Sequence, residues 1–173
     1  SQHLATTYPH KPEKAPVLVR GDTNITIDEW ITPTLGQRTR DPVESPDGAI
    51  WWTGMWASLV GRLDPNTGAM QEYQLPSSAR PHSIVPDTDG FIWYTGNSNG
   101  TIGRLNPADG SIKEYPTRAR DPHTAVFHPN GNLYFTSQHS NMLGRFNPKA
   151  GELKEIETRK KPYGIKVGKA GDL

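Results

Sequence analysis

The run Thr101-Ile102-Gly103-Arg104-Leu105-Asn106-Pro107 decides the fold, because the chain carries three versions of it. It stands earlier as Leu59-Val60-Gly61-Arg62-Leu63-Asp64-Pro65 and later as Met142-Leu143-Gly144-Arg145-Phe146-Asn147-Pro148. Glycines 61, 103 and 144 are thus 42 and 41 residues apart, and glycines 48, 90 and 131 keep the same intervals. Self-similarity at such a period indicates a repeat architecture.

Each repeat contains four short strand patterns separated by turn residues. In the middle copy we predict strands over 81–85, 91–95, 101–105 and 111–115, with a Pro/Gly hairpin at 106–110. The second strand is bulky on both faces in every copy, as in Ile92-Trp93-Tyr94, so it must be covered on both sides. Stacked four-stranded antiparallel sheets of about 42 residues predict an all-β fold, the β-propeller.

The repeats place three full blades at about 42–75, 81–117 and 122–158, and a further blade begins at 162. Residues 1–24 show no strand pattern and are expected to be an extended tail or linker, whereas 25–30 resembles a lone outer strand. Three and a fraction blades cannot close a ring. We therefore expect further blades, or a partner chain, to complete this partial propeller of residues 25–173.

Composition excludes several classes of protein. The 173 residues contain no cysteine, which excludes disulfides and Cys-ligated metals. No apolar run is long enough for a membrane-spanning helix, so we expect no membrane span. The formal net charge of +1 gives no overall attraction for nucleic acid, and we expect no such partner.

Two histidines form the sharpest candidate site. His82 and His123 follow proline at the same repeat position, on innermost strands that converge on the central channel. Neutral imidazoles there would serve as a general base or as metal ligands. The alternative is a polar channel lining without a chemical role, since Val43 and Tyr163 occupy the matching positions in the flanking copies.

A second pattern is basic. The loop into each innermost strand carries cations, and sheet topology puts these loops on one face, around the channel mouth: Arg38, Arg40, Arg80, Arg118, Arg120, Arg159, Lys160 and Lys161. Such a rim would attract an anionic ligand, unless Asp41 and Asp121 pair locally with the neighbouring arginines. The candidate binding residues are Arg40, Arg80, Arg120, Lys161, Tyr163, Trp56 and His139.

Two further residue types have structural alternatives. Trp56 is either a stacking platform at the mouth or packs on Trp52, and the second is favoured. The recurrent strand-three arginines are expected to make blade-to-blade contacts: Arg62, Arg104 and Arg145.

The phrases Pro-His-Ser-Ile at 81–84, Gly-Phe-Ile-Trp-Tyr-Thr at 90–95 and Thr-Ile-Gly-Arg-Leu-Asn-Pro at 101–107 resemble the virginiamycin B lyase (streptogramin lyase) family, over residues 30–167. The resemblance implies a seven-bladed propeller in which a magnesium ion and a histidine–glutamate pair open a cyclic depsipeptide by elimination. It assigns the histidines to His82 and His123. The glutamate position, late in strand two, holds Gly54, Gly96 and Ser137, so the carboxylate is expected on blades beyond residue 173.

Two functions follow from these patterns. The first is a C–O lyase or ester-opening enzyme that acts on an anionic or cyclic ester in the channel. The alternative is a non-catalytic exported module that binds a protein or small ligand on its basic rim. A sugar-lactone hydrolase is a weaker third option, because it needs several channel carboxylates. We expect a periplasmic or secreted location.

Overall fold

The computed structural model describes residues 21, 26–76 and 78–173, which form strands and no helix. The three sheets of four antiparallel strands are ordered β1-β2-β3-β4, β5-β6-β7-β8 and β9-β10-β11-β12. We call these sheets the first, second and third blades. The strands are β1 Thr39–Glu44, β2 Ile50–Gly54, β3 Leu59–Leu63, β4 Met70–Gln74, β5 Pro81–Pro86, β6 Ile92–Gly96, β7 Thr101–Leu105, β8 Ile112–Pro116, β9 Pro122–Phe127, β10 Leu133–Ser137, β11 Met142–Asn147 and β12 Glu152–Glu157.

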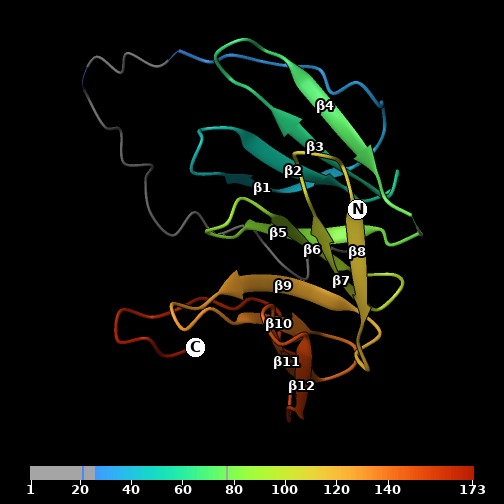
Figure 1. The fold of residues 1–173 in the computed structure, drawn as a ribbon, viewed down its shortest axis with the longest axis vertical. Coiled ribbons are helices and arrows are strands. Elements are labelled where there is room, and N and C mark those ends of the chain that lie inside the picture. The colour runs from blue at the N-terminus through green and yellow to red at the C-terminus, as the bar shows by residue number, and fades with distance from the viewer. Residues whose placement is uncertain (1–20, 22–25, 77) are drawn as a thin grey trace, which may run out of the picture.

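The three blades stack face to face, one after another along the long axis of the molecule (Figure 1). The first strand of each blade is the innermost, since β5 contacts both β1 and β9. With no described helix, this part of the chain contains no helical segment suited to crossing a membrane. The all-β propeller architecture predicted from the repeat is confirmed.

The repeated Gly-Arg motif has a steric cause. Gly61, Gly103 and Gly144 pair across the sheet with Trp52, Tyr94 and Phe135, respectively. In each pair the aromatic ring covers the glycine, so that a Cβ at the glycine would overlap ring atoms. The period of the glycine is therefore tied to the period of the aromatic residue beside it.

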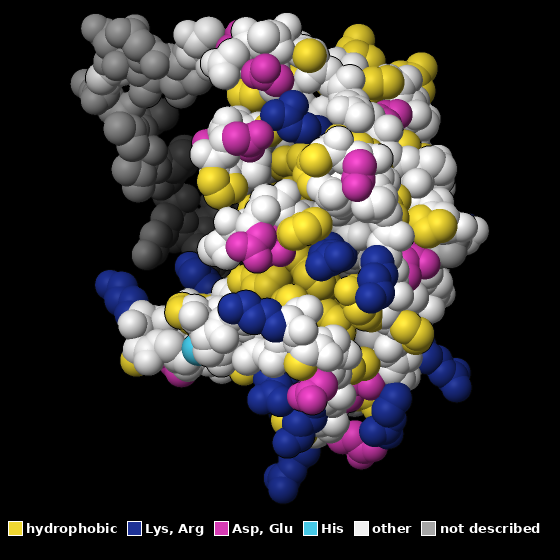
Figure 2. Space-filling model, viewed as in Figure 1, with side chains coloured by type: hydrophobic (Ala, Val, Ile, Leu, Met, Phe, Trp, Pro, Cys, Tyr) yellow, Lys and Arg dark blue, Asp and Glu magenta, His cyan; other side chains and the backbone are white. Residues whose placement is uncertain are grey.

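The blades are held together by apolar faces at equivalent repeat positions. Trp51, Val60 and Tyr73 of the first blade pack in one core with Ile84, Ile92, Tyr94 and Leu105 of the second. In the next core, Trp93, Ile102 and Tyr115 of the second blade pack with residues of the third. Hydrophobic side chains bordered by Lys and Arg are visible near the middle of the face in Figure 2.

The third blade carries the same apolar positions on its other face, as Tyr134, Leu143 and Ile156. There Ile156 is 54% exposed, whereas Tyr73 at the matching position of the first blade is 8% exposed. Within the described residues, this face is only partly covered.

Two expected strands are absent from the described residues. Residues 26–30 form no strand, which corrects the lone outer strand predicted over 25–30; the rest of that prediction and the 1–24 tail, Gly21 apart, lie outside the described residues. The residues that follow contact the first blade, where Glu72 accepts hydrogen bonds from Thr34 and Gln37. Residues 162–168 likewise form no strand, because no strand lies beside them to pair with.

Two of the strand-three arginines, Arg62 and Arg104, contact their own blades. Arg62 forms an ion pair with Asp47 at 3.0 Å, and Arg104 lies 4.4 Å from the centre of the Phe91 ring. These contacts correct the expectation that these two arginines join one blade to the next.

Candidate functional site

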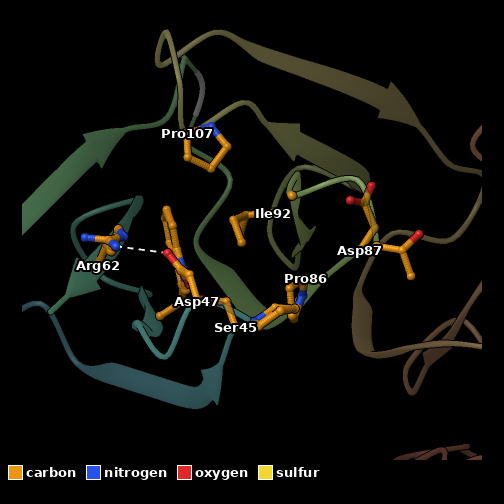
Figure 3. Close-up of a pocket in the computed structure, with 11 residues that line it drawn as sticks. Ser45, Asp47, Arg62, Pro86, Asp87, Ile92 and Pro107 are labelled. Carbon is orange, nitrogen blue, oxygen red and sulfur yellow. Dashed lines mark hydrogen bonds and ion pairs between the residues drawn. The ribbon is translucent and has the colours of Figure 1, made fainter. Parts of the chain in front are cut away.

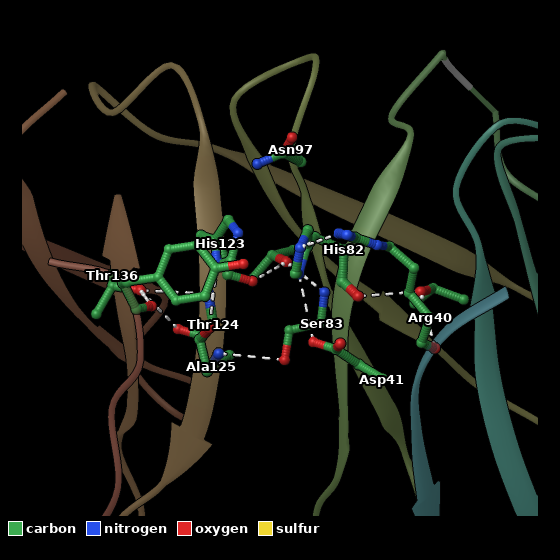
Figure 4. A network of polar contacts seen from close by, with 12 residues as sticks. Arg40, Asp41, His82, Ser83, Asn97, His123, Thr124, Ala125 and Thr136 are labelled. Atoms are coloured by element: carbon green, nitrogen blue, oxygen red, sulfur yellow. Dashed lines mark hydrogen bonds and ion pairs between the residues drawn. The ribbon is translucent and has the colours of Figure 1, made fainter. Parts of the chain in front are cut away.

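Three rings from successive repeats form a row along the innermost strands. The rings of His82 (β5) and His123 (β9) lie 3.6 Å apart between centroids, and Tyr163 follows 4.3 Å from His123. Figure 4 shows the two histidines side by side, with Arg40 on the far side of His82. Both histidines are buried, at 6% and 7% exposure, whereas Tyr163 is 57% exposed.

A threonine in each second strand fixes this row. Thr53 donates a hydrogen bond to the His82 carbonyl (3.0 Å), and Thr95 donates to the His123 carbonyl (2.8 Å). Thr136 does the same for the Tyr163 carbonyl (2.7 Å). Each hydroxyl thus positions the channel residue of the following repeat. No predicted site included these threonines, although they recur at the same intervals of 42 and 41 residues as the glycines, which is a signal that identifies them.

Arg40 belongs to this channel row rather than to the rim. Its Nη1 lies 2.5 Å from Nε2 of His82, and Nδ1 of His82 lies 3.3 Å from Oδ2 of Asp41. Because a guanidinium only donates, Nε2 of His82 is the acceptor of this contact. The Nδ1 of His82 is buried without a hydrogen bond, although it faces the Asp41 carboxylate.

His123 is held uncharged. Burial, the neighbouring His82 and Arg40 lower its pKa to about 4, and the attraction of Asp41 and Asp121 offsets them only in part. Its Nδ1 lies 3.0 Å from the Thr124 hydroxyl. His123 is therefore a neutral ring near pH 7.

A histidine–carboxylate pair lies at the channel-mouth end of the third blade. Asp121 directly precedes β9, and its Oδ2 is 2.9 Å from Nδ1 of His139 in the β10–β11 loop. Burial would raise the pKa of Asp121, but hydrogen bonds from Ser137, His139 and Ser140 outweigh it and lower the pKa to about 2. The His139 side chain is 72% exposed. A fixed carboxylate on Nδ1 leaves Nε2 of an exposed imidazole directed away from the carboxylate.

The positions that the family resemblance assigns to a glutamate lack room for one in two blades. A Cβ at Gly54 would meet the Gln37 and Leu59 side chains, and one at Gly96 would meet Asn99 and Thr101. In the third blade, Ser137 donates a 2.6 Å hydrogen bond to Asp121. A carboxylate therefore does reach this location in the third blade, from the preceding loop.

The described residues do not by themselves form a magnesium site. Among them, no three His, Asp or Glu side chains are grouped so that they could hold a metal ion. Asp121 has both oxygens engaged by the protein, and Asp41 is the carboxylate that faces His82. The donor set that the resemblance implies does not fit this part of the chain.

The basic loops lie together on one face. The loops that join the fourth strand of one blade to the first strand of the next are hydrogen-bonded to the loops between second and third strands. Examples are the bonds from Ser98 N to Ala79 O (2.9 Å) and from Thr158 N to Asn141 O (2.7 Å). Exposed cations of these loops are Arg38, Arg80, Arg118, Arg120, Arg159, Lys160 and Lys161. Within the described chain, Asp41 and Asp121 pair with histidines, so the expected local pairing with arginine is not what the structure shows.

Trp56 stands out on the same face. It is 63% exposed, and the Arg38 guanidinium lies 5.2 Å from its ring centre. The favoured interpretation, that Trp56 is buried against Trp52, is therefore wrong: Trp52 instead covers Gly61 and donates to Gln37.

Comparisons with known proteins agree on one family. The family model described as the virginiamycin B lyase family matches residues 13–173. A solved streptogramin B lyase is 31% identical, covers 84% of this chain and 50% of its own, and superposes with a TM-score of 0.79. The virginiamycin B lyase from Staphylococcus aureus is 28% identical over 80% of this chain and 48% of its own, with a TM-score of 0.74.

A catalytically inactive variant of the Staphylococcus aureus enzyme, solved with quinupristin, is 29% identical over 80% of this chain, with a TM-score of 0.73. No curated protein matches the chain in a comparison of sequences. The chain spans about half the length of the solved lyases that it matches.

Proposed function

The chain belongs to the virginiamycin B lyase family, and from this membership we propose that it opens a cyclic or anionic ester by elimination at the channel mouth. Solved structures that the chain resembles include a streptogramin B lyase and a virginiamycin B lyase. Quinupristin accompanies one of them and is therefore the first substrate to test. The setting that we propose is periplasmic or secreted.

The Asp121–His139 pair is the observation that carries this proposal. Its Asp121 is ionised at neutral pH and fixes the Nδ1 proton of His139 at 2.9 Å. The exposed Nε2 is then the lone-pair nitrogen, which is the arrangement that a general base requires. His123 is buried and its pKa is lowered to about 4, whereas His139 is exposed to a substrate, so His139 is the better candidate.

The proposed step balances without a further reactant. Nε2 of His139 removes a proton from the carbon next to the one that bears the ester oxygen. The electron pair of that C–H bond forms a carbon–carbon double bond as the C–O bond breaks, and the pair from the C–O bond leaves with the carboxylate. The product is an opened ring of unchanged mass, and the exposed Arg80, Arg120 and Lys161 would attract its carboxylate.

The channel row would back the site rather than bind the substrate directly, because Nε2 of His82 is engaged by Arg40 and its Nδ1 is buried. His82 and Arg40 contribute to the low pKa of His123, so His123 does not compete for the proton in transfer. Magnesium remains part of the family resemblance, but these steps use the side chains of this chain alone.

The test is to incubate the protein with quinupristin and follow the ligand by mass spectrometry. Elimination gives a ring-opened isomer, whereas hydrolysis adds the mass of one water, so the two reactions are told apart directly. We expect His139→Gln and Asp121→Asn to lower the rate by about 10²-fold or more. The matched control is His128→Gln, in the β9–β10 turn at the opposite edge of the same blade, which should keep the wild-type rate. Ring opening at the wild-type rate in both His139→Gln and Asp121→Asn would refute the role of the Asp121–His139 pair.

The basic face supports a second candidate, a non-catalytic module that binds an anionic partner. Arg80, Arg120 and Lys161 are exposed there and form no ion pair within the described residues. Changing all three to Gln should weaken binding of inorganic tripolyphosphate and flatten its salt dependence. The control is the same triple change at Lys113, Lys149 and Lys154, which lie outside these loops. Equal affinity and salt slope in both triple variants would reject this candidate.

A further inference from the structure

A groove separates the first and second blades at the edge opposite the channel-mouth loops. Its volume is about 260 Å³, and its walls are mostly apolar. Figure 3 shows the Arg62–Asp47 ion pair on one side of it and Pro86, Ile92 and Pro107 on the other. The Trp51 ring also lines it.

At the equivalent place between the second and third blades, two phenyl rings pack against Trp93 and Arg104, and the rest of that place is an open groove of about 400 Å³ that Phe127 lines. Phe127, the last residue of β9, lies edge-on to Trp93 with centroids 6.0 Å apart and planes at 78°. Phe91, directly before β6, lies beneath the Arg104 guanidinium, 4.4 Å away. Trp93 and Arg104 occupy the repeat positions of Trp51 and Arg62.

In the first-to-second interface both phenyl rings are missing from the sequence. Pro86 ends β5 where Phe127 ends β9, and Ala49 precedes β2 where Phe91 precedes β6. The part of the groove beside Trp51 and Arg62 thus corresponds to space that aromatic side chains occupy one repeat later. The chain itself shows which shape fits between such a tryptophan and such an arginine.

The polar edge of the groove carries one guanidinium and two carboxylates. Asp47 is paired with Arg62, and Asp87 accepts hydrogen bonds from two backbone amides and the Trp93 indole, so the edge has one net negative charge. Hydrogen bonds from Ser45 and Arg62 hold the pKa of Asp47 below its ordinary value, so it stays ionised. The Asp47 side chain is 60% exposed and accessible to a ligand. A positively charged group beside the ring would complement this edge.

We propose that this groove is a binding site for an aromatic ring that carries a nearby ammonium group, such as the N-terminal phenylalanine of a peptide. The ring takes the place that Phe127 and Phe91 take in the next interface, and the ammonium group faces Asp47. The groove is lined by the β1–β2 and β5–β6 turns, so it is separate from the Asp121–His139 pair and does not depend on the proposed elimination.

The probe for the test is 2-phenylethylamine, titrated into the protein while the indole N–H resonance of Trp51 is followed by NMR. That N–H donates to Ser45, which also lines the groove, so the resonance reports on occupancy. For a probe of this size we expect saturation with a Kd of about 1 to 10 mM. 3-Phenylpropionate, with the opposite charge, and 2-cyclohexylethylamine, without the aromatic ring, should each bind more weakly.

Pro86→Phe is the decisive variant, because it supplies the ring that the next repeat carries at this position. It should lower the affinity for 2-phenylethylamine by about tenfold or more. Asp47→Asn should reduce the preference for the amine over the acid by about three- to fivefold. The control Asn132→Phe adds a phenyl ring at the repeat position of Ala49, but in the third blade, and should bind like wild type.

Three results would overturn the proposal. The first is the absence of a saturable shift of Trp51 in the wild-type protein. The second is unchanged binding in a Pro86→Phe variant whose other tryptophan resonances show that it is folded. The third is equal or tighter binding of the acid or of the cyclohexyl amine.

Discussion

Tyr94 lies flat over Gly103, and the ring has little freedom to move. Its hydroxyl donates to Glu114 at 2.9 Å, and the side chain is 1% exposed. At this scale the requirement for glycine comes from the ring and not from the backbone, since Gly103 does not have a positive φ. The pairs Trp52–Gly61 and Phe135–Gly144 repeat the arrangement.

Gly103→Ala is therefore expected to destabilise the protein by about 1–3 kcal/mol, because the added methyl group overlaps the Tyr94 ring. Gly164→Ala is the matched control, as its Cβ would meet nothing within 4 Å. It should change the free energy of unfolding by no more than about 0.5 kcal/mol. Urea denaturation of both variants measures the difference, and equal stability would contradict the steric explanation.

The channel-row residue His123 makes stability depend on pH. Its pKa of about 4 in the folded protein lies below the ordinary value of 6.5, so between these pH values the unfolded chain binds a proton that the folded chain does not. Stability should fall as the pH is lowered through this window. Asp121, with a pKa of about 2 against 3.8, adds a further loss only below about pH 4.

His123→Gln should remove the first of these losses. We expect the difference in unfolding free energy between wild type and variant to shrink steadily from about pH 7 to pH 4. His128→Gln, in an outer turn, serves as the control and should retain the wild-type slope. A His123→Gln variant with the wild-type pH dependence would show that this imidazole does not titrate as described.

At the scale of the strands, one hydroxyl links three backbone segments. Thr95 in β6 accepts a hydrogen bond from Ser83 N of β5 (2.9 Å) and donates to the His123 carbonyl of β9 (2.8 Å). It is fully buried, so neither partner has water as a substitute. These hydrogen bonds fix the position of β9 relative to β5 and β6, and therefore the position of His123 beside His82.

Thr95→Val keeps the shape but removes both hydrogen bonds. We expect a loss of about 1–3 kcal/mol in unfolding free energy, because a buried amide and a buried carbonyl lose their partner. Thr88→Val, on an exposed turn, is the control and should be nearly neutral. The variants are compared by thermal and urea unfolding. If the buried variant is as stable as the exposed one, the hydroxyl does not join the blades.

At the scale of the whole molecule, the outer face of the third blade is the least covered part of the core. Tyr134, Leu143 and Ile156 occupy the positions that are buried between blades elsewhere, and a lysine and an arginine border them. Blades of this kind gain much of their stability from the interface with a neighbour. An uncovered apolar face of this kind favours association.

The chain of residues 1–173 on its own should therefore self-associate, and Ile156→Glu should reduce the association. Ala150→Glu, which adds the same charge on the exposed hairpin after β11, should not. Sedimentation velocity at several concentrations distinguishes the two. A wild-type chain that stays monomeric and melts cooperatively would show that this face needs no cover.

The sequence by itself determined the blades, their order and the residues of the innermost strands. The reason is that a repeat fixes backbone positions: glycine and its aromatic partner recur at 42 and 41 residues, and the strands β5–β8 fall within one or two residues of the ranges predicted. The sequence also predicted that His82, His123 and Tyr163 lie next to one another, because equal repeat positions on innermost strands converge.

Only the tertiary structure decided where the charged side chains go. Asp41 and Asp121 both stand in Arg-Asp-Pro triplets, yet the strand register puts Asp41 inside β1 and Asp121 before β9, so Asp41 faces His82 and Asp121 faces His139. Asp41 has a positive φ of 42° and Asp121 does not. Thr39 pairs with Gly54 as Pro81 pairs with Gly96, so Arg40, and not Val43 as predicted, occupies the repeat position of His82. A repeat sets where a residue stands, but its partner depends on local backbone geometry and on the neighbouring blade, which no period in the sequence records.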